Sequence, residues 1–247
     1  MIPAAEVGSW AARFGVPSIQ IERDHFISHL LSVLAEIGEL RFFGGTALCR
    51  THLRGSRLSE DVDLLSRSAS ADTDALAAEM PRALRTRFAP ITVGAVVRES
   101  DGFGFSIGTT DFEHVKVYVG RDGPNLRAYA FAPSEVDLRY SDLPATVTLE
   151  CPTLPSFAAM KLSAWYDRHA PRDLFDLAGL ARLGALADPE VSAMFRVANS
   201  FTPTAAEFAR APKSTVTAWE PELGAQVGLL PPIDACLRDM REALQPE

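Results

Sequence analysis

Apolar residues recur every three or four positions near the start of the chain, at Ile27, Leu30, Leu31, Leu34 and Ile37. Residues three and four apart lie on the same side of an α-helix, so this spacing predicts an amphipathic packing helix within a helical region of ~40 residues. Beyond it the polarity pattern changes to a period of two, which predicts that strands follow the helices.

Strict alternation is found where Asp61 and Asp63 are polar and Val62 and Leu64 are apolar. Alternate side chains of a strand point to opposite faces, so the two carboxylates share one face while the apolar side chains anchor the other. Further strands are predicted at 40–43, 91–97, 102–108, 112–119 and 147–150, and a helix at 75–88 after a polar turn at 68–74.

Three prolines, Pro144, Pro152 and Pro155, punctuate the chain around the last of these strands. Beyond them helical periodicity dominates, so we place a domain boundary here, with a domain of mixed sheet and flanking helices at 1–150 and a helical domain at 151–247. The predicted fold class is α+β. Helices of the second domain are predicted at 156–168, 171–183, from 189 onward and at 232–243, whereas 202–219 shows no clear pattern.

The chain has 247 residues, of which 47% are hydrophobic, so it is long enough to bury a full core. Its net charge of −8 excludes polyanion binding by overall charge, and any nucleic-acid site must be local. No stretch approaches the roughly 18 to 20 apolar residues of a membrane span, and the N-terminus lacks a signal-peptide pattern, so we expect a cytoplasmic protein with no membrane contact. Three widely spaced cysteines offer neither a disulfide framework nor a zinc pattern and are interpreted as packing residues: Cys49, Cys151 and Cys236.

Residues 43–65 read FGGTALCRTHLRGSRLSEDVDLL and carry the clearest chemistry. Gly44 and Gly45 form a close turn after a strand, and Thr46 is expected to cap a helix at 47–53, whose first amides favour phosphate. Together with the two aspartates, which can hold Mg²⁺, this order predicts a site for a metal-bound nucleoside triphosphate. The alternative is a glycine-rich turn followed by an exposed acidic turn around Ser59.

An arginine cluster, Arg50, Arg54 and Arg57, leads into the aspartates. It fits a local RNA contact or a solvated helix end, and the sequence leaves both open.

In the second half, Lys161 and Arg168 share one helical face with Trp165. The two cations fit a triphosphate tail, and they equally fit a helix whose basic side chains extend into solvent. Asp173 and Asp176 belong to the next helix, and each has an alternative to catalysis: Asp173 favours the positive end of that helix, and Asp176 can pair with Arg172 four residues before it.

A third metal-binding carboxylate would be expected on a neighbouring strand. In the strand at 112–119, the positions that can face the two aspartates are Lys116 and Tyr118, and the acidic residues Asp111 and Glu113 lie only near its start. The identity of the third ligand therefore stays open. The five histidines show no spacing that we interpret as metal-binding, and Ser59 is not in a nucleophile elbow.

Taken together, these motifs resemble the AbiEii family of nucleotidyltransferase toxins, which includes the MenT-type tRNA nucleotidyltransferases, within the DNA polymerase β-like superfamily. The likeness spans most of the chain and consists of ordered elements: an EKD-like triplet at Glu22-Arg23-Asp24, GGTAL at 44–48, SED-x-D at 59–63, and a lysine helix followed by RDxxDL at 172–177.

The resemblance implies a polymerase β-like nucleotidyltransferase sheet, followed by a helical C-terminal domain that contributes to the active site. It implies a catalytic set of Asp61, Asp63, Lys161, Asp173 and Asp176, with Mg²⁺ (alternatively Mn²⁺) on the first two. It implies nucleotide contacts from Gly44, Gly45, Thr46, Ser59, Lys161 and Arg172. One departure concerns the strand where many members carry K-h-E or K-h-D (h apolar): this chain has Lys116-Val117-Tyr118, which favours a single metal ion.

By the same resemblance we expect an enzyme that transfers NMP from an NTP to RNA, at the tRNA 3′ acceptor end. It would act as a growth-inhibiting toxin that is controlled by a cognate antitoxin encoded nearby. The alternatives are nucleotidyl transfer to a protein or to a small molecule such as an antibiotic, and a non-catalytic nucleotide- or antitoxin-binding module.

Overall fold

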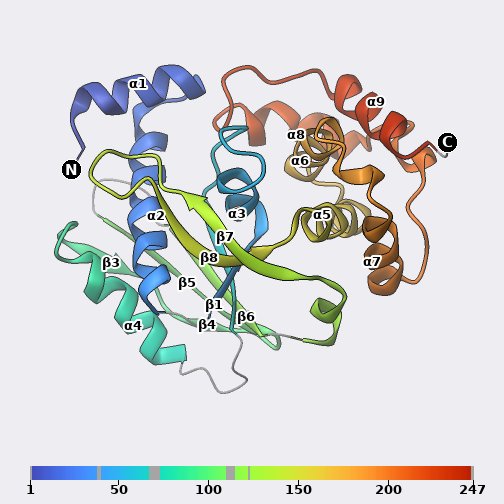
Figure 1. Cartoon of the computed structure of the whole chain (residues 1–247). Coiled ribbons are helices and arrows are strands. Elements are labelled where there is room, and N and C mark those ends of the chain that lie inside the picture. The colour runs from blue at the N-terminus through green and yellow to red at the C-terminus, as the bar shows by residue number, and fades with distance from the viewer. Residues whose placement is uncertain (1, 38–39, 67–72, 110–114, 122, 246–247) are drawn as a thin grey trace. The chain divides into compact units, whose positions relative to one another are not determined.

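The computed structural model describes residues 2–37, 40–66, 73–109, 115–121 and 123–245. The chain divides into two compact units (Figure 1). The first unit contains Met1–Gly123 and Pro133–Cys151, and the second contains Pro124–Ala132 and Pro152–Glu247. The segment Pro124–Ala132, which the sequence analysis placed in the first domain, therefore belongs with the helices of the second unit.

The first unit is built on an eight-stranded mixed sheet with the order β3-β5-β6-β2-β1-β8-β7, with β4 paired to β5. Helix α4 contacts β3 and β5 and lies beside α2 (Figure 1). The elements are α1 (Ala4–Phe14), α2 (Ser18–Ile37), β1 (Leu40–Phe43), α3 (Gly44–Arg50), β2 (Asp61–Ser66), α4 (Thr73–Leu84), β3 (Ile91–Val93), β4 (Val97–Arg98), β5 (Gly102–Thr109), β6 (Val115–Arg121), β7 (Phe131–Asp137) and β8 (Thr146–Pro152).

One face of the sheet is apolar and buried. Val62 and Leu64 on β2 and Val117 and Val119 on the parallel strand β6 are at most 1% exposed. The predicted alternation of β2 is confirmed for residues 61–64, because Val62 and Leu64 pack into the core while Asp61 and Asp63 are partly exposed.

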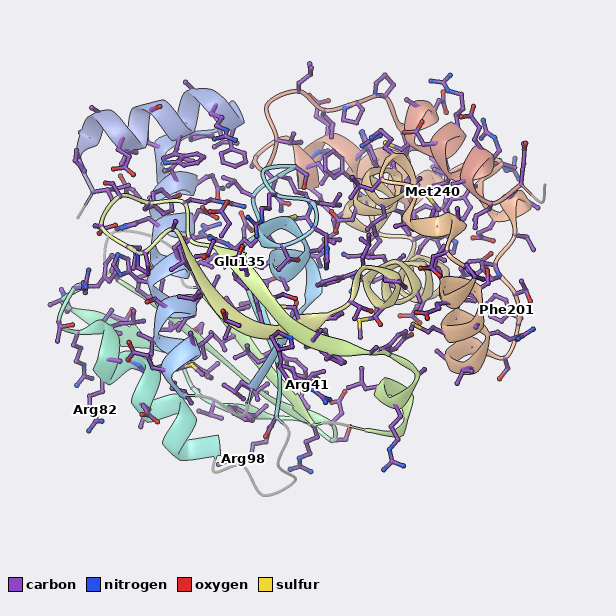
Figure 2. The ribbon with its side chains drawn as sticks, in the orientation of Figure 1. Arg41, Arg82, Arg98, Glu135, Phe201 and Met240 are labelled. Carbon is purple, nitrogen blue, oxygen red and sulfur yellow. The ribbon has the colours of Figure 1, made fainter. Side chains whose placement is uncertain are left out.

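The opposite face of β2 and β6 carries polar side chains. The register pairs Asp61 with Lys116 and Asp63 with Tyr118, so these four side chains share that face. On the neighbouring strand β1, Arg41 (labelled in Figure 2) forms an ion pair with Glu150 of β8, with 3.3 Å between Nε and Oε2. The sheet thus presents a row of charged and polar groups on the side that carries the two aspartates.

The predicted arginine cluster does not form an exposed patch. Arg50, at the end of α3, is 1% exposed, and its Nη2 lies 2.8 Å from the carboxylate of Asp24 on α2. Arg139 binds the same carboxylate at 3.0 Å, and Tyr140 donates a hydrogen bond to it at 2.8 Å. Arg57 is also 1% exposed. Both alternatives for the cluster, an RNA contact and a solvated helix end, are therefore wrong for two of its three arginines.

Burial alone would raise the pKa of Asp24, but Arg139 and Arg50 outweigh it and lower that pKa below its ordinary value. The carboxylate is thus held in its charged form inside the first unit. This ion cluster joins α2, α3 and the connection between β7 and β8, three segments that are far apart in sequence.

The second unit is helical, as predicted. Trp165 is fully buried and stacks on Phe208 with 5.7 Å between ring centroids. The segment without a clear pattern, 202–219, contains a 3₁₀ turn and most of a helix. The elements are η1 (Pro124–Ala128), α5 (Leu154–Arg168), α6 (Pro171–Arg182), η2 (Ala185–Ala187), α7 (Pro189–Asn199), η3 (Ala205–Phe208), α8 (Lys213–Leu223) and α9 (Ile233–Ala243).

Some of the predicted strands and turns differ from the structure or lie outside the described residues. The strand predicted at 91–97 is two short strands, because pairing with β5 is interrupted around Gly94. Strand β7 was not predicted. Most of the polar turn at 68–74 and the start of the strand at 112–119, with Asp111 and Glu113, lie outside the described residues. Across the described ranges, no helix combines the length and the apolar character needed to cross a membrane.

Candidate active site

The turn between β1 and α3 is shaped by the two glycines and by Asp63. Gly44 has φ +78°, a conformation that L side chains rarely adopt. A β-carbon at this position would collide with the carboxylate of Asp63, which lies directly against the Gly44 α-carbon. Phe43 pairs with Asp63 in the antiparallel register, so the end of β1 delivers the turn to that carboxylate.

The second glycine is packed just as closely. A β-carbon at Gly45 would lie 2.7 Å from Nη2 of Arg57 and 3.5 Å from Oγ of Ser59. The turn is therefore bounded by Asp63 at its first glycine and by Arg57 and Ser59 at its second. Any ligand at this turn meets backbone rather than side chains at positions 44 and 45.

Thr46 does not cap a helix, which corrects the prediction. Helix α3 already begins at Gly44, and the residue before it, Phe43, makes no side-chain cap. The hydroxyl of Thr46 instead donates to the backbone carbonyl of Asp61. This bond ties the first turn of α3 to the start of β2, and it brings Gly44, Gly45, Thr46, Ser59, Asp61 and Asp63 together.

The two aspartates supply a donor set that fits a hard divalent cation. Asp61 and Asp63 are partly accessible and lie on one face of β2, and carboxylate oxygens are the ligands that Mg²⁺ and Mn²⁺ prefer. The Asp63 carboxylate fills the space that a β-carbon of residue 44 would occupy, so glycine at this position is what allows that carboxylate to lie against the backbone.

Tyr118 occupies the register position of the carboxylate found in K-h-E or K-h-D strands, but it does not replace that carboxylate. Burial, a hydrogen bond with Asp101 and nearby acidic groups raise the pKa of Tyr118 to about 12. The phenol is therefore neutral at ordinary pH and is a poor ligand for Mg²⁺.

Helix α2 also holds the segment that leads into β2. Arg23 forms an ion pair with Glu60 at 2.6 Å, immediately before the first aspartate. With Asp24 bound to Arg50, two adjacent residues of α2 thus fix the two ends of the segment from α3 to β2. The EKD-like triplet accordingly has a supporting role in the first unit.

In the second unit, Lys161 of α5 lies between two carboxylates of α6. Its Nζ is 3.0 Å from Oδ1 of Asp173 and 2.7 Å from Oδ2 of Asp176, and both aspartates are fully buried. Arg168, about two turns along the same face of α5, binds the other oxygen of Asp173 with its Nε at 2.7 Å. Two cations therefore offset two buried anions.

For Lys161 this cluster corrects the alternative in which the basic side chains of α5 extend into solvent, because Lys161 is only 7% exposed, whereas the Arg168 side chain is 49% exposed. Burial alone would raise the pKa of Asp173, but Lys161 and Arg168 outweigh burial and lower it. Arg172 is half-buried in the first turn of α6. A carboxylate with a lowered pKa is a weak base, so the arrangement suits Asp173 to holding Lys161 rather than to accepting a proton.

Sequence reasoning missed Arg139 and Tyr140, which complete the ion cluster around Asp24. The signal available was an Arg-Tyr pair after a strand, but that strand, β7, was itself not predicted. Their partner Asp24 lies 115 and 116 residues away along the chain.

The chain is similar to known proteins over most of its length. The family model described as "Nucleotidyl transferase AbiEii toxin, Type IV TA system" matches residues 25–244. Among solved structures, the fold is similar to that of MenT4, a nucleotidyltransferase toxin from Mycobacterium tuberculosis H37Rv, with a TM-score of 0.64 and 18% identity over 99% of this chain and 89% of that chain. An antigenic nucleotidyltransferase-like protein from Paracoccidioides brasiliensis gives a TM-score of 0.43 and 18% identity over 72% of this chain and 86% of that chain. No protein with a curated description matches the sequence.

Proposed function

The chain belongs to the AbiEii family of nucleotidyltransferase toxins of type IV toxin–antitoxin systems, and on this basis we propose that it transfers NMP from an NTP to RNA, at the 3′ acceptor end of tRNA. The observation that carries the proposal is the contact between the Asp63 carboxylate and the Gly44 backbone. It supports the proposal because the carboxylate proposed to hold the cation lies against the backbone at the start of α3, whose amides are proposed to bind phosphate.

In the proposed reaction an acceptor hydroxyl attacks the α-phosphorus of the NTP. A new P–O bond forms, the bond between the α-phosphorus and the bridging oxygen breaks, pyrophosphate leaves, and the proton of the acceptor hydroxyl is released to solvent. Gly44, Gly45, Thr46 and Ser59 bind and orient the triphosphate, and the neighbouring aspartates hold the divalent cation.

We take that cation to be Mg²⁺, with Mn²⁺ as the alternative; when bound, it neutralises charge on the phosphates. Asp61 and Asp63 are its proposed ligands. The neutral phenol of Tyr118 supports a single ion rather than two.

Lys161 and Arg172 are proposed to supply positive charge to the nucleotide. Asp173 and Asp176 hold Lys161 with its ammonium group fixed in position, which limits the entropy lost when it meets a phosphate. The lowered pKa of Asp173 supports this positioning role over that of general base.

An RNA acceptor rests on the resemblance to the MenT-type enzymes, and a second acceptor class has an observation in its favour. Arg50 and Arg57 are buried, so they are not available to bind an RNA backbone, and the chain carries a net charge of −8. Transfer to a protein hydroxyl or to a small molecule would use the same catalytic set without an extended basic surface. A cognate antitoxin is the partner that membership of a type IV system implies.

The test incubates purified protein with Mg²⁺, each α-labelled NTP in turn and total tRNA, beside an Asp63→Ala variant. Label on tRNA that disappears in the variant supports the proposal and identifies the nucleotide. Label on protein or on a small molecule, with none on tRNA, moves the acceptor to the second class. No transfer to any acceptor, with binding of NTP retained, would favour a non-catalytic nucleotide-binding module.

A further inference from the structure

Two imidazole rings and a carboxylate converge in the first unit, away from the nucleotide motif in sequence. His25 and His29 lie one turn apart on α2, and Asp142 lies in the connection between β7 and β8. Nε2 of His25 is 3.0 Å from Oδ1 of Asp142, and Nε2 of His29 is 3.1 Å from Oδ2. The two Nε2 atoms are 3.0 Å from each other.

Hydrogen bonds alone do not satisfy this triangle. A neutral imidazole carries a single N–H, on one of its two nitrogens. If both Nε2 atoms carry the proton, each donates to Asp142, but the two N–H groups then face each other at 3.0 Å. If only one carries it, the other ring turns a lone pair toward an anion. At most two of the three contacts are favourable in either case.

A cation satisfies all three contacts at once, because each ligand atom then directs a lone pair at it. Atoms about 3 Å apart that each lie about 2.1 Å from a common ion subtend roughly 90° at that ion, the angle of one face of an octahedron. Two histidines and one carboxylate in a facial arrangement are a known ligand set for first-row transition metals. Imidazole nitrogen disfavours Mg²⁺ and Ca²⁺, which prefer oxygen.

The surroundings suit such a site. The imidazole side chains are 5% exposed, whereas the Asp142 side chain is 27% exposed and leaves a path for an ion. The ring of Phe88 lies 5.0 Å from that of His29, and the ring of Tyr140 lies 4.9 Å from that of His25.

We propose that His25, His29 and Asp142 bind one divalent first-row transition-metal ion. The ion fastens the β7–β8 connection to α2. Arg139 and Tyr140 of the same connection bind Asp24 on α2, so the metal reinforces a junction that the ion cluster already begins. The four-residue spacing of His25 and His29 on a helix was the available sequence signal for this site, but the third ligand, Asp142, follows 113 residues after His29.

The test uses untagged full-length protein, stripped with EDTA and returned to buffer containing excess Mg²⁺. Isothermal titration calorimetry with Zn²⁺ should give one bound ion per chain. The same stoichiometry is expected for the variant Asp61→Asn/Asp63→Asn, which removes the carboxylate pair as a competing Zn²⁺ site. X-ray absorption at the zinc edge of the wild-type protein should show two imidazole ligands.

Asp142→Asn should weaken Zn²⁺ binding roughly tenfold or more, since it removes the anionic ligand at a partly exposed position. His29→Asn should do the same, whereas His169→Asn, which alters a histidine of the second unit, should bind Zn²⁺ as the wild type does. Zn²⁺ should raise the Tm of the wild type and not that of Asp142→Asn. Absence of imidazole ligands at the zinc edge, or equal Zn²⁺ affinity in Asp142→Asn and wild type, would overturn the proposal without any reliance on the fold of the His29 variant.

Discussion

The carboxylate of Asp63 lies in the space that a β-carbon of residue 44 would occupy. Gly44 is therefore needed for two separate reasons, its left-handed backbone and the carboxylate beside it. Glycine at position 44 thus preserves both the backbone turn and the orientation of the Asp63 side chain. This single contact links the two halves of the motif, GG and DxD, from which the nucleotide site was predicted.

Gly44→Ala should abolish this arrangement. The left-handed φ costs about 1–2 kcal/mol for a residue with a β-carbon, and Asp63 must also move. We expect the free energy of unfolding to fall by more than this cost and nucleotidyl transfer to fall at least tenfold. Urea unfolding and the labelled-NTP assay measure the two effects.

Gly184→Ala is the matched control for that variant. Gly184 has φ +73°, and a β-carbon there meets nothing within 4 Å. It should show the backbone cost alone, with transfer unchanged. Equal transfer by Gly44→Ala and Gly184→Ala would mean that Asp63 does not need the Gly44 turn.

Tyr118→Phe should retain transfer within a few-fold of wild type, whereas Asp63→Asn should lose at least a hundredfold. The reason is that Tyr118 is a neutral phenol whose pKa is raised to about 12, so its hydroxyl supplies no anionic ligand. Rates at saturating Mg²⁺ and NTP decide the matter. A loss in Tyr118→Phe as large as that in Asp63→Asn would show that the tyrosine acts directly in the reaction.

The parts of this site that the sequence predicted are those encoded locally. Alternation around Asp61 puts both carboxylates on one face because a strand repeats every two residues. The glycines indicate a turn because few other residues adopt a left-handed backbone conformation. Strand β7 escaped prediction because Pro133 interrupts its pattern. The sheet order puts β7 at an edge, where a proline without an N–H is tolerated.

What the sequence could not show are pairings between distant segments. The burial of Arg50 depends on Asp24, which lies 26 residues away, and nothing in the arginine spacing distinguishes a buried ion pair from a solvated helix end. The same holds for Lys161, whose partners lie on the next helix. The pattern of charged residues describes one segment of the chain, whereas the burial of a side chain depends on which other segments pack against it.

Lys161→Met should destabilise the second unit strongly. It leaves Asp173 with Arg168 but removes the ammonium group that lies 2.7 Å from the Asp176 carboxylate, and breaking a buried ion pair costs about 3–5 kcal/mol. Lys161→Met/Asp176→Asn should recover part of that loss, because the buried carboxylate that Lys161 offsets is then replaced by a neutral amide. Urea unfolding of both variants measures the difference, and a double variant no more stable than the single one would refute this account.

Acid should remove the contribution of Asp173 to stability. Lys161 and Arg168 outweigh burial and lower its pKa below 3.8, so the unfolded chain binds a proton more readily than the folded chain. The contribution is therefore present above that ordinary value and is lost as pH falls through the folded pKa. The difference in unfolding free energy between wild type and Asp173→Asn should be constant near neutral pH and shrink in acid. A gap that widens as pH falls would reverse the assigned direction.

Arg50→Met tests whether the arginine cluster serves the fold or a ligand. Arg50 is 1% exposed and pairs with Asp24, so its loss leaves that carboxylate with Arg139 and Tyr140 alone. Since one cation is kept, we expect a loss at the lower end for a broken buried pair, about 3 kcal/mol. Arg54→Met is the matched variant, because the Arg54 side chain is 45% exposed, and surface changes of this kind usually stay within about 0.5 kcal/mol. If Arg50→Met instead weakened RNA binding while its unfolding free energy matched that of Arg54→Met, the cluster would be a ligand site; a large loss of stability in Arg50→Met alone assigns it to the junction of α2 and α3.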